Sequence, residues 1–147
     1  LYVHEFIESF YEENGIPEKP GLKETIQYFK RNDFKLGLAS SSSMKTIYRN
    51  LQAANLEGVF DEIIGRDMVE KAKPNPMIYK KVCKRLGEAP ENCYVLEDSK
   101  NGILAAHGAG CKVIMIPDII EADEEVEAKL YKKFESLFEV KKYFEEQ

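Results

Sequence analysis

The chain has 147 residues, of which 44% are hydrophobic and 32% are charged, a composition typical of a globular protein that can bury one ordinary core. Its formal net charge of −5 comes without a basic face, which argues against nucleic acid as a partner. No apolar stretch approaches the length of a membrane span and no signal-peptide pattern opens the sequence, so we expect no membrane partner.

Helical and extended patterns alternate along the chain. Val3, Phe6, Ile7 and Phe10 recur at helical spacing and predict a helix over residues 2–14. Beyond the proline breaks that follow, the patterns predict helices near 22–31, 45–55, 76–86, 99–108 and 123–132, strands near 35–39, 61–64, 93–96, 112–116 and 134–136, and a short final helix. Strands that alternate with helices predict an α/β fold, with a parallel sheet covered on both faces.

Three polar groups lie at or near the ends of predicted strands. The apolar run 35–39 stops at Ser40, the run 93–96 stops at the carboxylates of Glu97 and Asp98, and Lys73 lies in a loop between these runs. In open parallel sheets, ligands bind beyond the carboxyl ends of the strands. We therefore expect the hydroxyl, the ammonium and the carboxylate pair to converge in one crevice, where together they can bind a phosphate and a divalent cation.

Three motifs carry a resemblance to a known family. They are LASSS (Leu38–Ser42), KPNP (Lys73–Pro76) and LEDSKNGILAA (Leu96–Ala106), and they stand in the family's order and at its spacing. From Pro20 onward the chain resembles the haloacid dehalogenase-like hydrolase superfamily, in the branch of beta-phosphoglucomutase and related sugar-phosphate phosphatases. The resemblance implies a Rossmann-like three-layer sandwich with a mainly parallel sheet.

The resemblance also implies roles for the phosphate-binding residues. Ser40 is similar to the family hydroxyl that binds the transferring phosphoryl group, and the backbone N–H of Ser41 would be a further donor. Ser42 is similar to a position that contacts the other end of the substrate. Lys73 resembles the lysine that neutralises the phosphoryl oxygens and the attacking carboxylate. Met44 stands where mutase members carry a polar residue for a second phosphate, and a thioether is poorly suited to that role.

Glu97 and Asp98 resemble the acidic pair that holds Mg²⁺ in this family. By that analogy Asp98 would bind the cation directly and Glu97 would bind it through a water molecule. On the residues alone, the serine run also fits a turn or a helix N-cap, and either carboxylate also fits a cap of the helix at 99–108. Gly102 is small enough to let that helix lie close to the sheet.

The implied activity is that of a Mg²⁺-dependent phosphatase of small phosphorylated metabolites, acting through an aspartyl-phosphate. The alternatives are a phosphoglucomutase-like phosphotransferase and a non-catalytic phosphate- or metal-binding module. In the family, the nucleophile lies in a DxDG-type motif on the first strand, and this sequence contains no such motif. We therefore expect an inactive core-domain fragment, with residues 1–16 as a remnant of the helical cap and residues 17–147 as the core domain.

The first strand of the family lies in the centre of the sheet. Without it, about ten ladder groups would each cost about 1–3 kcal/mol if buried and unpaired. That cost rivals the whole stability of a domain, about 5–15 kcal/mol. We therefore expect this position to be filled from outside the chain, by upstream residues, a cleaved segment or a strand swapped in a homo-oligomer; otherwise the strands ending at Ser40 and Glu97 would pair directly.

The three cysteines bear on the cellular compartment. Cys83, Cys93 and Cys111 are odd in number and show no CxxC spacing. They are therefore expected to be reduced thiols, which favours a cytoplasmic protein.

Overall fold

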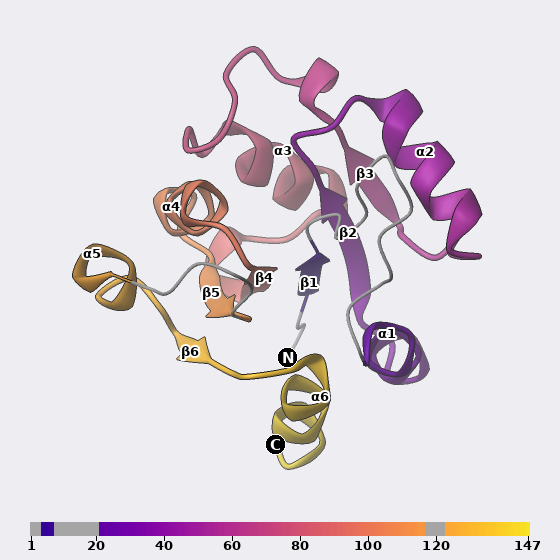
Figure 1. The fold of residues 1–147 in the computed structure, drawn as a ribbon, viewed down its shortest axis with the longest axis vertical. Coiled ribbons are helices and arrows are strands. Elements are labelled where there is room, and N and C mark those ends of the chain that lie inside the picture. The colour runs from indigo at the N-terminus through magenta and orange to yellow at the C-terminus, as the bar shows by residue number, and fades with distance from the viewer. Residues whose placement is uncertain (1–3, 8–20, 117–122) are drawn as a thin grey trace.

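The structure, a computed structural model, describes residues 4–7, 21–116 and 123–147. Within these ranges, six strands pair in one parallel sheet in the order β3-β2-β1-β4-β5-β6 (Figure 1). The strands are β1 (His4–Ile7), β2 (Lys35–Ala39), β3 (Glu62–Ile64), β4 (Cys93–Glu97), β5 (Lys112–Met115) and β6 (Lys132–Lys133). The α-helices are α1 (Leu22–Arg31), α2 (Met44–Ala53), α3 (Met77–Leu86), α4 (Lys100–Gly108), α5 (Glu124–Glu127) and α6 (Leu137–Glu145).

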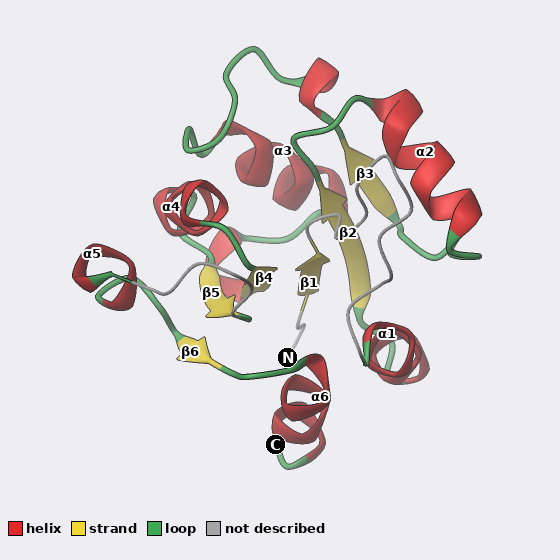
Figure 2. Ribbon diagram, in the orientation of Figure 1, coloured by secondary structure: helices red, strands yellow, loops and turns green. Residues whose placement is uncertain are grey.

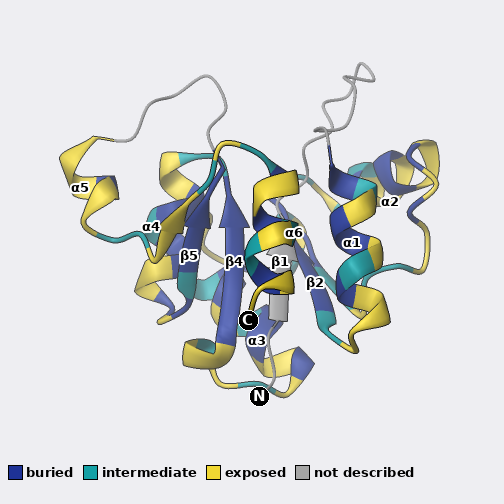
Figure 3. Cartoon of the chain, turned by 90° about the horizontal axis from the view of Figure 1, so that it is seen from below, coloured by how far each residue is buried: buried dark blue, intermediate teal, exposed yellow. Residues whose placement is uncertain are grey.

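Helices cover both faces of the sheet, as the alternating pattern predicts (Figure 2). Buried side chains of α3 and α4, such as Val82 and Ile103, form a core on one face. Those of α1, α2 and α6, such as Phe29, Ile47 and Val140, form a second core on the other face. In Figure 3 the strands β2, β4 and β5 are mostly buried, whereas the helices over them are striped with buried and exposed residues. The α/β prediction is confirmed.

The centre of the sheet corrects one expectation. Residues 4–7, predicted to be helical, instead form β1, which pairs in parallel with β2 and β4; Glu5 lies opposite Leu36 and Tyr94. The central position is therefore occupied by a segment of the chain itself, and neither an outside strand nor direct pairing of β2 with β4 is needed. The physical reason is that the ladder groups of β2 and β4 require partners, and a short apolar segment satisfies both edges.

The remainder of the predicted N-terminal helix lies outside the described residues. β1 belongs to the core sheet, so residues 4–7 are not helical cap. The boundary between a cap remnant at residues 1–16 and a core at 17–147 otherwise stays a prediction.

The C-terminal elements differ in extent from those predicted. α5 is a single turn, Glu124–Glu127, and the edge strand lies at Lys132–Lys133 rather than at 134–136. The N–H of Tyr131 donates to the carbonyl of Val113 at 2.8 Å, and the N–H of Phe134 donates to the carbonyl of Met115 at 3.0 Å. Because the chain pairs with β5 here, the strand begins at Lys132, two residues before the apolar pattern predicts.

The three cysteines lie together in the core beneath α3. Cys83 Sγ is 3.5 Å from Cys93 Sγ and 3.7 Å from Cys111 Sγ, and all three are free thiols. The hydrogen bond with Cys111 and burial raise the pKa of Cys83, while the hydrogen bond with Cys83 and burial raise that of Cys93. The raised pKa values keep Cys83 and Cys93 protonated and poorly reactive.

Within the part of the chain that the structure describes, none of the helices has the length and apolar character needed to cross a lipid bilayer.

Candidate active site

The serine loop follows β2 at the carboxyl edge of the sheet. Ser40 is buried; its N–H donates to the carbonyl of Ile64 at 3.0 Å, and its Oγ accepts the N–H of Ser42 at 3.1 Å. Ser43, rather than Ser40, caps α2 by accepting the N–H of Thr46. The Ser40 hydroxyl is thus fixed in the turn and is not used as the helix cap. Ser41 is exposed and Ser42 is half-buried in the same turn.

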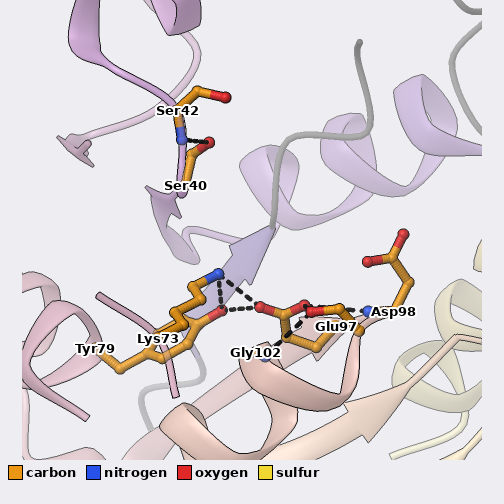
Figure 4. Close-up of polar contacts among 8 residues, drawn as sticks. Ser40, Ser42, Lys73, Tyr79, Glu97, Asp98 and Gly102 are labelled. Carbon is orange, nitrogen blue, oxygen red and sulfur yellow. Dashed lines mark hydrogen bonds and ion pairs between the residues drawn. The ribbon is translucent and has the colours of Figure 1, made fainter. Parts of the chain in front are cut away.

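The loop that follows η1, a short 3-10 helix at Arg66–Met68, brings Lys73 to β4. Lys73 Nζ lies 2.8 Å from Glu97 Oε2, and the exposed fractions of the two side chains are 4% and 0%. The ammonium also donates to the hydroxyl of Tyr79 on α3, at 3.2 Å, and Tyr79 donates a short hydrogen bond to Glu97 Oε2. Figure 4 shows this closed triangle of three side chains. A buried cation and a buried anion here neutralise each other, with a phenol bonded to both.

The second oxygen of Glu97 faces the start of α4. Glu97 Oε1 accepts the N–H of Asp98 at 3.2 Å and the hydroxyl of Ser99 at 3.3 Å. Ser99 caps α4, because its Oγ accepts the N–H of Gly102 at 3.1 Å. The Glu97 carboxylate therefore lies against the first turn of the helix, where the positive end of the helix dipole favours an anion.

Gly102 is required by this arrangement. A Cβ placed on Gly102 would overlap with the Cδ and both oxygens of Glu97, far inside normal van der Waals contact. Gly102 was expected to let the helix lie close to the sheet. The structure shows that it makes room for the carboxylate of Glu97.

Asp98 follows β4 and diverges from its neighbour. Its side chain is half-buried, and Figure 4 shows its carboxylate directed away from the Lys73–Tyr79–Glu97 triangle. The two adjacent carboxylates expected as a pair therefore face different surroundings. Glu97 is enclosed by its donors, while Asp98 lies nearer the surface.

The predicted groups share one edge of the sheet, but only some of them touch. Lys73 contacts Glu97 directly. Ser40 and Ser42 lie across the end of β1 from this pair in Figure 4, because β1 separates β2 from β4 in the sheet. The common edge follows from the parallel pairing of all three strands.

Tyr79 is the residue that sequence reasoning missed. It is fully buried, and it stands on the same helix stripe as Ile78, Val82 and Leu86, so it resembles any core aromatic residue. The available signal was its hydroxyl, since a buried phenol needs a hydrogen-bond partner. Burial, and then the charge of Glu97, raise the pKa of Tyr79 well above its usual value, which keeps the hydroxyl protonated as a donor.

The donor set can be tested against Mg²⁺, which binds through one or two carboxylates with waters and substrate phosphates in the remaining positions. The part of the chain that the structure describes holds no cluster of three or more His, Cys, Asp or Glu side chains able to bind a metal. Asp98 fits as a direct carboxylate ligand. Each oxygen of Glu97 already accepts two donors, which together use its four acceptor sites. Glu97 can therefore accept a metal-bound water only when one of these donors, such as Lys73, turns away.

Comparison with known proteins places this chain in one class, the haloacid dehalogenase-like hydrolases, whose family pattern matches residues 1–116. The chain belongs to this family. It is 38% identical over 99 residues to the phosphorylated carbohydrates phosphatase of Thermotoga maritima, covering 67% of this chain and 46% of that protein. It is 32% identical over 101 residues to hexitol phosphatase B of Escherichia coli K12, covering 69% of this chain and 46% of that protein.

Solved structures agree with this assignment. CbbY from Rhodobacter sphaeroides, solved in complex with phosphate, matches with a TM-score of 0.76 and 33% identity, over 83% of this chain and 55% of that one. A beta-phosphoglucomutase from Clostridium difficile matches with a TM-score of 0.73 and 28% identity, over 90% of this chain and 56% of that one. The chain spans about half the length of the curated relatives it matches.

Proposed function

We propose that this chain carries the phosphoryl-transfer site of a Mg²⁺-dependent phosphatase that acts on small phosphorylated metabolites through an aspartyl-phosphate. The observation that carries the proposal is the buried Lys73, held 2.8 Å from Glu97 at the carboxyl edge of the sheet, next to Asp98. Relatives named as phosphatases of phosphorylated carbohydrates and of hexitols support the substrate class.

In the proposed reaction, the carboxylate of a DxDG-type motif, which this sequence does not contain and a longer protein would supply, attacks phosphorus. The bond from phosphorus to the ester oxygen breaks, and the alcohol leaves. Water then attacks the acyl phosphate and releases orthophosphate, which regenerates the carboxylate. Lys73 faces the phosphoryl oxygens with a compact positive charge, and the Ser40 hydroxyl orients one of them. Glu97 and Tyr79 hold the ammonium in place. Asp98 would hold Mg²⁺, which supplies charge neutralisation for the phosphoryl oxygens when bound.

A phosphomutase is the second candidate, because a beta-phosphoglucomutase is among the structural neighbours. Met44 disfavours it. The N–H of Met44 donates to the Asp67 carboxylate at 3.1 Å, and its thioether offers no donor for a second phosphate. A non-catalytic phosphate-binding module is the third candidate.

Asp98→Asn tests the proposed activity. We expect a longer protein that joins this chain to a DxDG-type motif to hydrolyse phosphate esters with Mg²⁺ and not with EDTA. In that protein, Asp98→Asn should lower kcat/KM by about 100-fold or more, because losing even an outer partner of a metal ligand costs about 10–100-fold. Hydrolysis is measured as orthophosphate release from a panel of sugar phosphates.

The matched control for this test is Asp123→Asn. Asp123 is an exposed carboxylate that pairs with Lys100 and caps α5, and asparagine caps helices equally well. It should retain full activity. Activity that survives Asp98→Asn would contradict the metal assignment, whereas phosphate binding without hydrolysis would favour the non-catalytic module.

We also infer a cytoplasmic location. The supporting observation is that Cys83, Cys93 and Cys111 are free thiols, although their sulfur atoms lie close together. An oxidising compartment favours disulfides among such neighbours.

A further inference from the structure

Tyr79 has a contact pattern that core packing does not require. Its side chain is fully buried, yet its hydroxyl lies at the centre of two polar contacts, one to each member of the Lys73–Glu97 ion pair. The hydroxyl accepts a hydrogen bond from the ammonium and donates one to the carboxylate. It therefore acts both as an acceptor and as a donor within the same ion pair.

The ring of Tyr79 also contacts Lys73. Lys73 Nζ lies 5.0 Å from the ring centroid, within the range of a cation–π interaction. Lys73 comes from a loop and has a long flexible stem, so a single contact to Glu97 would leave its ammonium several orientations. The phenol adds a second acceptor and an aromatic surface, and both come from the rigid helix α3.

We propose that Tyr79 is a positioning residue of the phosphoryl-transfer site, which orients the Lys73 ammonium and keeps Glu97 hydrogen-bonded when Lys73 turns toward a phosphoryl group. The inference rests on the proposed function and deepens it. An ammonium shared between a carboxylate and a phosphate weakens its bond to each. The Tyr79 hydroxyl remains as a donor to Glu97 Oε2, so the buried carboxylate is never left with its helix contacts alone.

Tyr94 provides a matched comparison within the same sheet. It is another buried tyrosine, on β4, but it packs with the aromatic cluster of Phe144 and Tyr131 on the opposite face from Tyr79. Removing its hydroxyl makes the same chemical change as at Tyr79 without touching Lys73 or Glu97.

The test compares wild type, Tyr79→Phe and Tyr94→Phe. Binding of orthophosphate is measured by calorimetry in Mg²⁺-free buffer. The constants kcat and KM are measured with Mg²⁺ in a longer protein that joins each variant to a DxDG-type motif. For Tyr79→Phe we expect the Kd for orthophosphate to rise about tenfold or more, as loss of a hydrogen bond to a charged group implies. We expect kcat to fall further than KM rises, because Lys73 contributes most in the transition state. Tyr94→Phe should match wild type in both.

A second readout is independent of activity. Reductive methylation of Lys73 by formaldehyde and a borane, followed by mass spectrometry, reports how firmly the ammonium is held. We expect methylation several-fold faster in Tyr79→Phe than in Tyr94→Phe. If wild type binds no phosphate, the proposed function falls, and the methylation rates then show only whether Tyr79 holds the Lys73 ammonium in place. Equal phosphate affinity, or equal methylation rates, in the two phenylalanine variants would overturn it.

Discussion

Lys73→Met is expected to lower the free energy of unfolding by about 3–5 kcal/mol, the cost of leaving one partner of a buried ion pair without the other. The pair is enclosed: the exposed fractions of the Lys73 and Glu97 side chains are 4% and 0%. Methionine keeps the length of the stem but removes the charge, so Glu97 retains only hydrogen bonds as compensation. Urea unfolding at neutral pH, followed by circular dichroism, measures the change.

Lys35→Met is the matched control. Lys35 Nζ also pairs with a glutamate, Glu88, at 3.1 Å, but its side chain is 41% exposed, and exposed pairs contribute about 0–1 kcal/mol. Adding Glu97→Gln to Lys73→Met should recover part of the loss, because the amide needs no counter-charge. If Lys73→Met costs no more than Lys35→Met, the buried pair does not have the energetic role assigned to it.

Gly102→Ala is expected to be nearly as destabilising. The new methyl group would occupy the space of the Glu97 carboxylate, so either the first turn of α4 shifts or Glu97 leaves Lys73. If the helix shifts, overpacking costs about 1–3 kcal/mol; if Glu97 leaves Lys73, the broken buried pair costs about 3–5 kcal/mol, so we expect a loss of up to about 5 kcal/mol. Thermal and urea unfolding measure this loss, and binding of orthophosphate should weaken with it.

Gly108→Ala is the control in the same helix. A Cβ on Gly108 would lie 3.4 Å from the Cβ of Pro76, at the border of ordinary contact. Helix propensity favours alanine over glycine, so the change should stay within about 1 kcal/mol of wild type. A Gly102→Ala protein as stable as Gly108→Ala would mean that Glu97 does not need the space beneath α4.

The sequence predicted most of the fold because its local and tertiary preferences agree. α1 and β2 match their expected ranges, 22–31 and 35–39, since a proline–glycine break precedes the first and an apolar run bounded by polar residues defines the second. β1 was missed. Phe6 and Ile7 belong to a short apolar pattern that fits a helix as well as a strand, and the choice depends on two partner strands far along the chain.

The candidate site, like the fold, was predicted only in part. Strand ends placed Ser40, Lys73 and Glu97 at one edge, because parallel strands bring their carboxyl ends together. That Lys73 would bind Glu97 itself, with Tyr79 completing the triangle, depends on side-chain reach across α3 and β4. Contacts between long side chains on different elements leave no repeating pattern in the sequence. The phenol hydroxyl in an aliphatic helix stripe was the one local clue.

The central claim is that Ser40, Lys73 and Asp98 serve a single phosphoryl group and its cation at the carboxyl edge of the sheet. A crystal structure of the protein grown with orthophosphate and Mg²⁺ tests this most directly. We expect phosphate within hydrogen-bond distance of both the Ser40 hydroxyl and the Lys73 ammonium, with the cation on the Asp98 carboxylate. Phosphate bound elsewhere on the molecule, with these three side chains still facing only protein and water, would contradict the account.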